Sequence, residues 1–392
     1  MDVADPLAPF RARFAVPDPG LVYLDGNSLG RPPLAAIEVV ARVTRDEWPG
    51  DLIRGWDRWL DLPLAVGDRL ATGVLGAREG EVAVIDSTTI NLFRLASAAL
   101  DARPGRRAVA IARSEFPTDR YVVEGLAAAR GLAIRWIDDD PIEGVTLDDI
   151  DRVLDVDVAL LVLSHVNYRS AAIADLPAIT RRARAGGALV VWDLSHAAGA
   201  VPVELAAAGA DLAVGCTYKY LNGGPGSPGY LYVRRELQGE LRPPIQGWFA
   251  QEDQFAMGPT FRRRDGIAAW LTGTPGVIGL AAAEAGMELT ADAGVERIRA
   301  KGIALTEYVI ELHDAWLAPL GCTLGSPRDA ARRGAQVAIR HPAAERLVAE
   351  LMERAVITDF RAPDSIRIGC SPLTTSFEDV WRGLVALRDL LE

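Results

Sequence analysis

The sequence predicts an α/β fold, with a large domain built on a mostly parallel sheet and a smaller α+β domain after it. Three observations support this prediction. Short apolar runs alternate with alanine-rich stretches between about residues 80 and 235, polar residues follow the ends of those runs, and the pattern changes after residues 272–276 (TGTPG). Continuous apolar runs separated by helical segments are typical of buried strands in a parallel sheet, whose crossovers are right-handed.

Seven apolar runs are expected to be strands. They lie at residues 82–85, 108–111, 134–137, 160–163, 189–192, 212–214 and 230–233. Polar side chains follow several of these runs, in the stretches DSTT (86–89), SEFPTD (114–119), SH (164–165) and DLSH (193–196). Ligands bind at the carboxyl edge of the strands in open α/β sheets. We therefore expect these stretches to meet at one ligand site.

The C-terminal part reads as a mixture of helices and strands. Apolar residues at helical spacing predict one long helix over residues 280–314. Two more helices are expected at 343–354 and 377–391, and two strands at 337–339 and 366–368. This pattern is typical of a small α+β domain.

Bulk properties exclude several classes of protein. The 392 residues carry a net charge of −11, which argues against binding of nucleic acid because no basic stripe is available to neutralise phosphates. The three cysteines, Cys216, Cys322 and Cys370, are too far apart to predict a disulfide framework or a zinc site. Neither a secretory signal nor an apolar run of membrane-spanning length is evident, so a cytoplasmic protein without membrane contact is expected.

Lys219 and Asp193 carry the strongest chemical signal. Lys219 follows an apolar run and precedes a glycine-rich loop, and Asp193 ends another apolar run in VVWDLSH. One cofactor, pyridoxal phosphate, would explain both residues. A lysine binds this cofactor as a Schiff base, and an aspartate pairs with its pyridine nitrogen. The hydroxyls of Thr88 and Thr89 lie where a strand would end and a helix begin, which suits a phosphate. Phe116, at a neighbouring strand end, could stack on the pyridine ring.

Two stretches match motifs of other protein classes, but the residues around them do not fit those classes. Residues 224–229 match G-x-G-x-x-G, but two prolines interrupt the stretch and a strand-like run follows it, whereas a dinucleotide site opens a helix. The stretch GNSLG around Ser28 matches a serine-hydrolase elbow, for which Asp193 and His196 would be the partners. Prolines at 32–33 follow Ser28 instead of a helix, and the two partners lie only three residues apart, so this function is disfavoured.

Several stretches in order resemble the kynureninase family: YLDGNSLG, EFPTD, LSHVNYRS, WDLSHAAGA, YKYLNGGPG and GWF. The resemblance extends from the DGNSLG loop to IRIGCSP near the C-terminus. It implies the fold type I of pyridoxal-phosphate-dependent transferases. It also implies hydrolytic Cβ–Cγ cleavage of L-kynurenine to anthranilate and L-alanine, in tryptophan catabolism or NAD biosynthesis. Whether 3-hydroxykynurenine is preferred stays open; Thr274 resembles the pattern of members that prefer kynurenine.

The resemblance also implies roles for individual residues. Lys219, Tyr218 and Asp193 would be catalytic. The cofactor contacts would be Thr88, Thr89, Phe116, Asp119, Ser164, Asp193, His196, Tyr218, Lys219, Trp248 and Thr274, of which Trp248 and Thr274 would reach the cofactor of a partner subunit. A homodimer with shared active sites follows from that. Arg367 would bind the substrate carboxylate, as its planar fork allows, and Ser28 would line the substrate side. Trp56 and Trp59 are equal candidates for a substrate-facing aromatic residue.

Three units are expected along the chain. Residues 1–45 would contribute to the active site and the small domain, residues 46–275 would form the large cofactor-binding domain, and residues 276–392 the small domain. Two alternatives remain. One is a different enzyme of the same fold, such as a cysteine desulfurase-like protein with Cys322 or Cys370 as its reactive thiol, or an aminotransferase-like protein. The other is a non-catalytic homologue that binds amino acids or partners.

Overall fold

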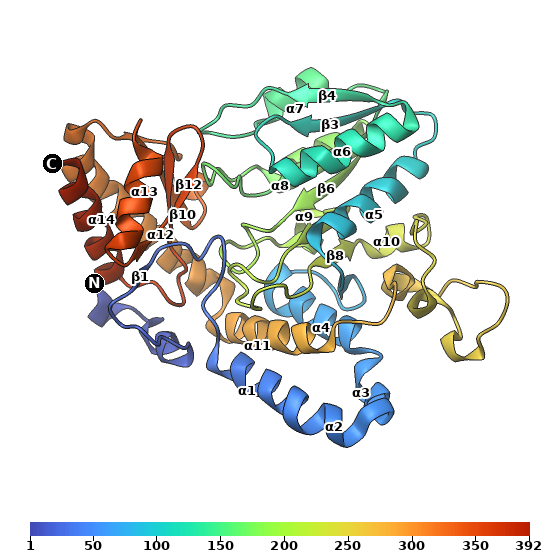
Figure 1. Cartoon of the computed structure of the whole chain (residues 1–392). Coiled ribbons are helices and arrows are strands. Elements are labelled where there is room, and N and C mark those ends of the chain that lie inside the picture. The colour runs from blue at the N-terminus through green and yellow to red at the C-terminus, as the bar shows by residue number, and fades with distance from the viewer.

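A seven-stranded sheet forms the centre of the chain in a computed structural model that describes all 392 residues (Figure 1). Its strands are β2 (Val82–Val84), β3 (Ala108–Ala112), β4 (Ala133–Ile137), β5 (Val158–Ser164), β6 (Leu189–Asp193), β7 (Leu212–Gly215) and β8 (Tyr230–Val233). The seven predicted strands are confirmed. Their order is β2-β8-β7-β6-β5-β3-β4, and all pairs are parallel except β8, which runs antiparallel to both β7 and β2.

Helices cover both faces of this sheet. Alternate residues of β5 illustrate why, since Leu161 and Leu163 belong to one apolar core and Leu160 and Val162 to another. The second core is completed by α5 (Thr88–Asp101) and α6 (Pro117–Arg130). The first core is completed by α4 (Leu62–Leu70), α8 (Leu176–Ala185), α9 (Leu205–Ala208) and α11 (Val277–Ala293). The strands are therefore buried on both sides and their ends alone are free to carry a site.

The helix predicted over residues 280–314 is wrong as a single element. The structure has two helices there, α11 and α12 (Val295–Leu312), separated by Gly294. Gly294 has φ +80, which other residues adopt only with strain, and it caps both helices. The direction of the chain changes at this point, so that α12 packs in the C-terminal part rather than along the large sheet.

A second, antiparallel sheet forms the core of the C-terminal part. Its strands are ordered β12 (Asp359–Arg361), β13 (Ser365–Gly369), β10 (Gln336–Arg340) and β9 (Thr323–Leu324). Helices α12, α13 (Ala344–Glu353) and α14 (Phe377–Leu391) pack on it around one apolar cluster. The predicted strands at 337–339 and 366–368, and the helices at 343–354 and 377–391, are confirmed, with each end shifted by at most one residue.

The N-terminal segment reaches across the molecule. Strand β1 (Val22–Tyr23) pairs in parallel with β11 (Val356–Ile357), and α1 (Leu34–Arg42) packs along α11 (Figure 1). The remaining helices are α2 (Trp48–Asp51), α3 (Trp56–Trp59), α7 (Leu147–Val153) and α10 (Arg235–Gln238). The domain boundaries given above stay predictions. None of the helices is both long and apolar enough to cross a membrane.

Candidate active site

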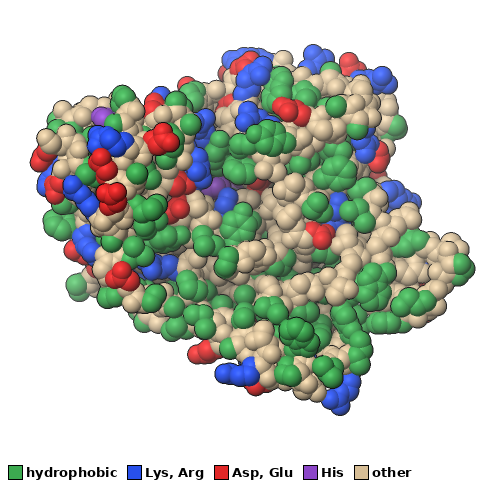
Figure 2. All heavy atoms as spheres, in the orientation of Figure 1, with side chains coloured by type: hydrophobic (Ala, Val, Ile, Leu, Met, Phe, Trp, Pro, Cys, Tyr) green, Lys and Arg blue, Asp and Glu red, His purple; other side chains and the backbone are tan.

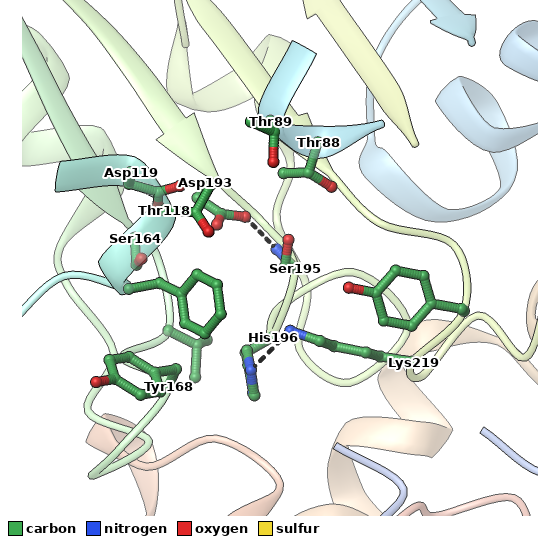
Figure 3. A pocket seen from close by; sticks show the side chains of 13 residues that line it. Thr88, Thr89, Thr118, Asp119, Ser164, Tyr168, Asp193, Ser195, His196 and Lys219 are labelled. Atoms are coloured by element: carbon green, nitrogen blue, oxygen red, sulfur yellow. Dashed lines mark hydrogen bonds between the residues drawn. The ribbon is translucent and has the colours of Figure 1, made fainter. Parts of the chain in front are cut away.

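A polar cavity of about 160 Å³ lies at the carboxyl ends of the central strands (Figure 3). Thirteen residues line it: Thr88, Thr89, Phe116, Thr118, Asp119, Ser164, Val166, Tyr168, Asp193, Ser195, His196, Tyr218 and Lys219. Ser164 and Asp193 are the last residues of β5 and β6, and the others come from the loops and helix starts that follow β2, β3, β5, β6 and β7. Nine of the thirteen are residues that the sequence analysis assigned to the cofactor, and the fold brings those nine together.

Lys219 reaches into the cavity from the loop after β7. Its Nζ donates a hydrogen bond of 3.0 Å to Nε2 of His196 and lies 5.9 Å from the centre of the Phe116 ring. Burial, and then the charge of Lys219, lower the pKa of His196 well below its usual range, so the imidazole stays neutral and can accept this bond. The lysine is thus aimed at the cavity by a neutral partner and is free to react.

Lys219 lies in the loop between β7 and β8, residues 216–229, which we call the lysine loop. Two glycines allow neighbouring segments to pack closely against its backbone. Gly30 donates its N–H to the carbonyl oxygen of Tyr218 at 2.8 Å, and a Cβ at Gly30 would collide with the carbonyl of Lys219. A Cβ at Gly286, in the middle of α11, would collide with the carbonyl of Leu221. Close approach of two backbones requires glycine, so the N-terminal loop and α11 both fix the position of Lys219.

A pair of buried carboxyl groups forms the opposite wall. Asp193, the last residue of β6, accepts a hydrogen bond of 2.7 Å from the backbone N–H of Ser195. Asp119 is buried, and its Oδ2 has no hydrogen-bond partner. Burial, and next the charge of Asp193, raise the pKa of Asp119 well above its usual range. An unsatisfied carboxyl beside a second one indicates that this wall is built for a ligand that brings a proton or a positive charge.

Glu115 supports this wall from behind and was missed from the sequence as a site residue. Both of its carboxylate oxygens accept from Ser164, one from the backbone N–H at 2.8 Å and one from the hydroxyl. Burial raises the pKa of Glu115 to about 7. Because the Ser164 hydroxyl donates its hydrogen bond to Glu115, its oxygen can act toward the cavity only as an acceptor.

The third wall is the first turn of α5. Ser87 caps this helix and accepts from the backbone N–H of Ile90, and Thr88 and Thr89 follow it. The free N–H groups of a helix start attract anions, and the two threonine hydroxyls add donors. Gly229 makes the approach possible, since a Cβ there would lie 2.8 Å from the backbone nitrogen of Thr88.

The three walls together match pyridoxal phosphate. The start of α5 suits its phosphate, the Asp193 and Asp119 carboxyls suit its ring nitrogen, and Lys219 suits its aldehyde carbon. Phe116 contributes a flat ring, and the Tyr168 ring supports it edge-on at 5.2 Å. The unsatisfied Oδ2 of Asp119 is the observation that calls for such a ligand.

Comparison with known proteins identifies the family. A family model described as the kynureninase C-terminal domain matches residues 298–387. The chain is 42% identical to the kynureninase of Pseudomonas fluorescens, over 100% of this chain and 94% of that protein. It is 43% identical, with the same coverage, to the kynureninase of Burkholderia pseudomallei strain K96243. The chain belongs to the kynureninase family. The resemblance found in the sequence is confirmed.

Solved structures show the same fold at lower sequence identity. A cysteine desulfurase of Thermococcus onnurineus NA1 superposes with a TM-score of 0.82, covers 95% of the chain and is 19% identical to it. The cysteine desulfurase CsdA of Escherichia coli gives 0.83 over 98% of the chain, also at 19% identity. These likenesses establish the fold alone, and they confirm the predicted fold class.

Four of the residues assigned from the kynureninase resemblance lie outside the cavity. Trp248 packs against Trp56 and Phe249, with ring centres 6.5 and 4.6 Å away. Thr274 lines a separate pocket of about 290 Å³. Ser28 and Arg367 form a partly buried polar cluster with Asp359. The structure of one chain therefore does not bring these four residues to the cavity.

Four lining residues were not assigned from the sequence: Thr118, Val166, Tyr168 and Ser195. All of them belong to stretches that carried the kynureninase resemblance, namely EFPTD, LSHVNYRS and WDLSHAAGA. Each lies within a few residues of an assigned residue, and this closeness was the sequence feature from which they could have been predicted. Trp56 and Trp59 are not separated by the structure, since they pack on each other at 6.2 Å and neither lines the cavity.

The geometry disfavours the other enzyme classes. The Ser28 hydroxyl is bonded to Asp359 and Arg367, while His196 is bonded to Lys219, so no triad of Ser28, His196 and Asp193 is assembled. Cys322 and Cys370 are both buried, and burial raises the pKa of the Cys322 thiol to about 11. A desulfurase needs an accessible, reactive cysteine, and neither thiol meets that need.

Proposed function

We propose that the chain is a kynureninase: a pyridoxal-phosphate-dependent enzyme that adds water across the Cβ–Cγ bond of L-kynurenine and releases anthranilate and L-alanine. The observation that carries this proposal is the position of Lys219 Nζ, in a cavity closed by an unsatisfied carboxyl on one side and a helix start on another. The full-length similarity to curated kynureninases supports the substrate.

Each wall has a proposed role toward the cofactor. Thr88, Thr89 and the hydroxyl of Tyr218 bind its phosphate, and Phe116 stacks on its ring. Asp193 keeps a proton on the pyridine nitrogen, with Asp119 beside it, and Ser164 and His196 make further contacts. When bound, the cofactor supplies an electron sink that stabilises negative charge at the α-carbon of the substrate.

The chain's own residues move the protons. With cofactor and substrate bound, the side-chain amine of Lys219 would take the proton from the α-carbon of the substrate. Its neighbour His196 is held neutral and can accept a hydrogen bond from the resulting ammonium. The charge of Cys216, and then burial, raise the pKa of Tyr218, so its hydroxyl stays protonated and is the proposed proton donor for the later steps.

Further residues are proposed for the substrate side of the site and for the contact between subunits. Arg367 binds the α-carboxylate of kynurenine, with Ser28 next to it. Trp248 and Thr274 complete the site of a partner subunit in a homodimer. Large apolar side chains are exposed around them and on α1 to α3: Leu34, Ile37, Trp48, Leu52, Ile53, Trp248, Phe255 and Met257. Figure 2 shows hydrophobic side chains over the lower right of the molecule, where these segments lie, which is expected of a surface that a second copy covers.

The test is product analysis with purified protein and added pyridoxal phosphate. L-Kynurenine should yield anthranilate, followed by its fluorescence, and L-alanine in equal amounts. L-Cysteine, tested in parallel, should release no sulfide. A protein that binds the cofactor but forms sulfide from cysteine and no anthranilate from kynurenine would contradict the proposal. Competition between kynurenine and 3-hydroxykynurenine decides which is preferred.

A further inference from the structure

Arg367 is held almost entirely by the protein's own acceptors. It lies on β13 directly opposite Asp359 of β12, and only 1% of its side chain is exposed. Asp359 accepts from Nε at 2.6 Å and also from Nη2, which is the forked arrangement that an arginine makes with a carboxylate. The edge of the guanidinium best suited to a substrate carboxylate is thus already occupied.

The remaining donors of Arg367 face other groups. Nη2 also donates to the Ser28 hydroxyl at 3.0 Å, and Nη1 donates to the carbonyl oxygen of Tyr168 at 2.7 Å. A guanidinium has five N–H groups. Four of them are used by Asp359, Ser28 and Tyr168. The fifth, on Nη1, lies 3.3 Å from the side-chain amide of Asn27, so it is the one N–H that a ligand could take over.

Nη1 is also the atom of Arg367 that contacts a residue lining the cofactor cavity. Its acceptor, Tyr168, lines that cavity, and the Tyr168 ring packs on Phe116. Asp359, by contrast, contacts Arg361, whose Nη2 lies 2.8 Å from Asp359 Oδ2. Because two arginines flank one carboxylate, the charge of Asp359 is balanced without using up the positive charge of Arg367.

We propose that Asp359 is a positioning residue for substrate recognition: it holds the Nε–Nη2 edge of Arg367, so that the substrate carboxylate is bound through Nη1. The inference rests on the proposed function, since it takes an α-amino acid as the ligand. It assigns Asp359 no contact with substrate. Without its carboxylate, Arg367 would keep its charge but lose the anchor that fixes its direction.

The test replaces Asp359 by Asn, which keeps the shape and one acceptor oxygen so that the fold is retained. Ligand binding is followed by the change in cofactor absorbance on titration with L-alanine, which has the carboxylate. The second ligand is the decarboxylated analogue of kynurenine, which lacks it. Asp359→Asn should raise the dissociation constant of L-alanine and the KM of kynurenine about tenfold, with kcat within about threefold of wild type. Its affinity for the decarboxylated analogue should not change.

Asp364→Asn is the matched control. Asp364 makes the same forked contact with Arg340, on the same sheet but away from Ser28 and Tyr168. It should leave all four quantities unchanged. Tighter binding of L-alanine by Asp359→Asn would show that Asp359 competes with the substrate, and would overturn the inference. An equal loss of affinity for both ligands would also overturn it. A wild-type protein that binds L-alanine but does not cleave kynurenine would refute the proposed function alone.

Discussion

Ser28 shows how one hydroxyl is defined by its neighbours. It accepts from Nη2 of Arg367 and donates to Asp359, both at 3.0 Å, and no histidine is bonded to it. A serine in this position orders an ion pair instead of attacking a substrate. Its partners lie more than 330 positions away in the chain, which is why the GNSLG pattern could not reveal them.

Ser28→Ala should weaken the binding of kynurenine and leave the cofactor bound as in wild type. Loss of one hydrogen bond to a charged group costs about 1.5 to 3 kcal/mol, which corresponds to a rise in KM of about tenfold or more. Steady-state kinetics and the visible spectrum measure the two effects. Ser114→Ala is the control, because that hydroxyl also joins a carboxylate, Asp139, but has no contact with Arg367. Complete loss of turnover with unchanged substrate binding would revive Ser28 as a nucleophile.

His165 gives the molecule a pH-dependent stability. It is buried, and burial lowers its pKa from 6.5 to about 4. Between these values the unfolded chain binds a proton that the folded chain does not, so the free energy of unfolding falls as the pH falls from 6.5 to 4. From pH 7.5 to pH 5 this loss should be about 2 kcal/mol.

The comparison of wild type with His165→Gln isolates this effect. The variant has no proton to take up at this position, so its free energy of unfolding should fall by about 2 kcal/mol less over the same pH range. Urea unfolding at the two pH values measures the difference. Parallel pH dependence of the two proteins would show that His165 does not carry the effect.

The residues found from sequence share one property. Lys219, Asp193 and Thr88 each follow a buried strand or begin a helix, and both features leave a pattern in the local sequence. Glu115 leaves no such pattern, since its role comes from a contact with Ser164, 49 positions away on another strand. The same holds for Asp359, which meets Arg367 only because β12 and β13 pair.

At the scale of elements, α11 matters because it holds the lysine loop. Gly286 lies in the middle of this helix, where alanine would ordinarily be better by about 0.5 to 1 kcal/mol. A Cβ there would collide with the carbonyl of Leu221 and lie 2.9 Å from the backbone carbon of Asn222. The intrinsic gain is therefore outweighed by a clash with backbone that cannot move without displacing Lys219.

Gly286→Ala should lower the thermal midpoint and raise the dissociation constant of pyridoxal phosphate. The expected destabilisation is about 1 to 3 kcal/mol, typical of overpacking. Gly125→Ala in α6 is the matched control, because nothing lies within 4 Å of its added Cβ and it should stabilise slightly. Calorimetry and cofactor titration measure both. Equal behaviour of the two variants would mean that α11 does not position the lysine loop.

Two features of the helices and strands were not predicted from the sequence. The antiparallel direction of β8 could not be predicted from the sequence, because all four of its residues are buried, as in the parallel strands β3, β6 and β7. The break at Gly294 did have a signal, the glycine itself, but the apolar spacing continues across it. The periodicity therefore predicted one helix where the backbone of Gly294 turns.

At the scale of the whole molecule, the proposed homodimer makes a quantitative prediction. Lys219→Ala and Trp248→Ala should each be inactive or severely impaired alone. If Trp248 serves the partner's site, a mixed dimer contains one site with both wild-type residues. Co-refolded equimolar subunits should then recover about one quarter of wild-type activity, since half of the dimers are mixed and each has one intact site.

Anthranilate formation after co-refolding measures this recovery, and mass measurement of differently tagged subunits establishes that mixed dimers form. The control is a mixture of Lys219→Ala with Asp193→Ala, whose intact residues would never meet in one site; it should stay inactive. Mixed dimers of Lys219→Ala and Trp248→Ala without activity would contradict the shared site.

The central claim is that Lys219 carries pyridoxal phosphate in the cavity between β6 and the start of α5. Treatment of the cofactor-loaded wild-type protein with sodium borohydride fixes the cofactor to the lysine that holds it, and peptide mass spectrometry then locates that lysine. We expect a single modified peptide containing Lys219, with the adduct lost in Lys219→Ala. Modification of Lys301, the one other lysine in the chain, or a protein that carries no cofactor at all, would contradict it.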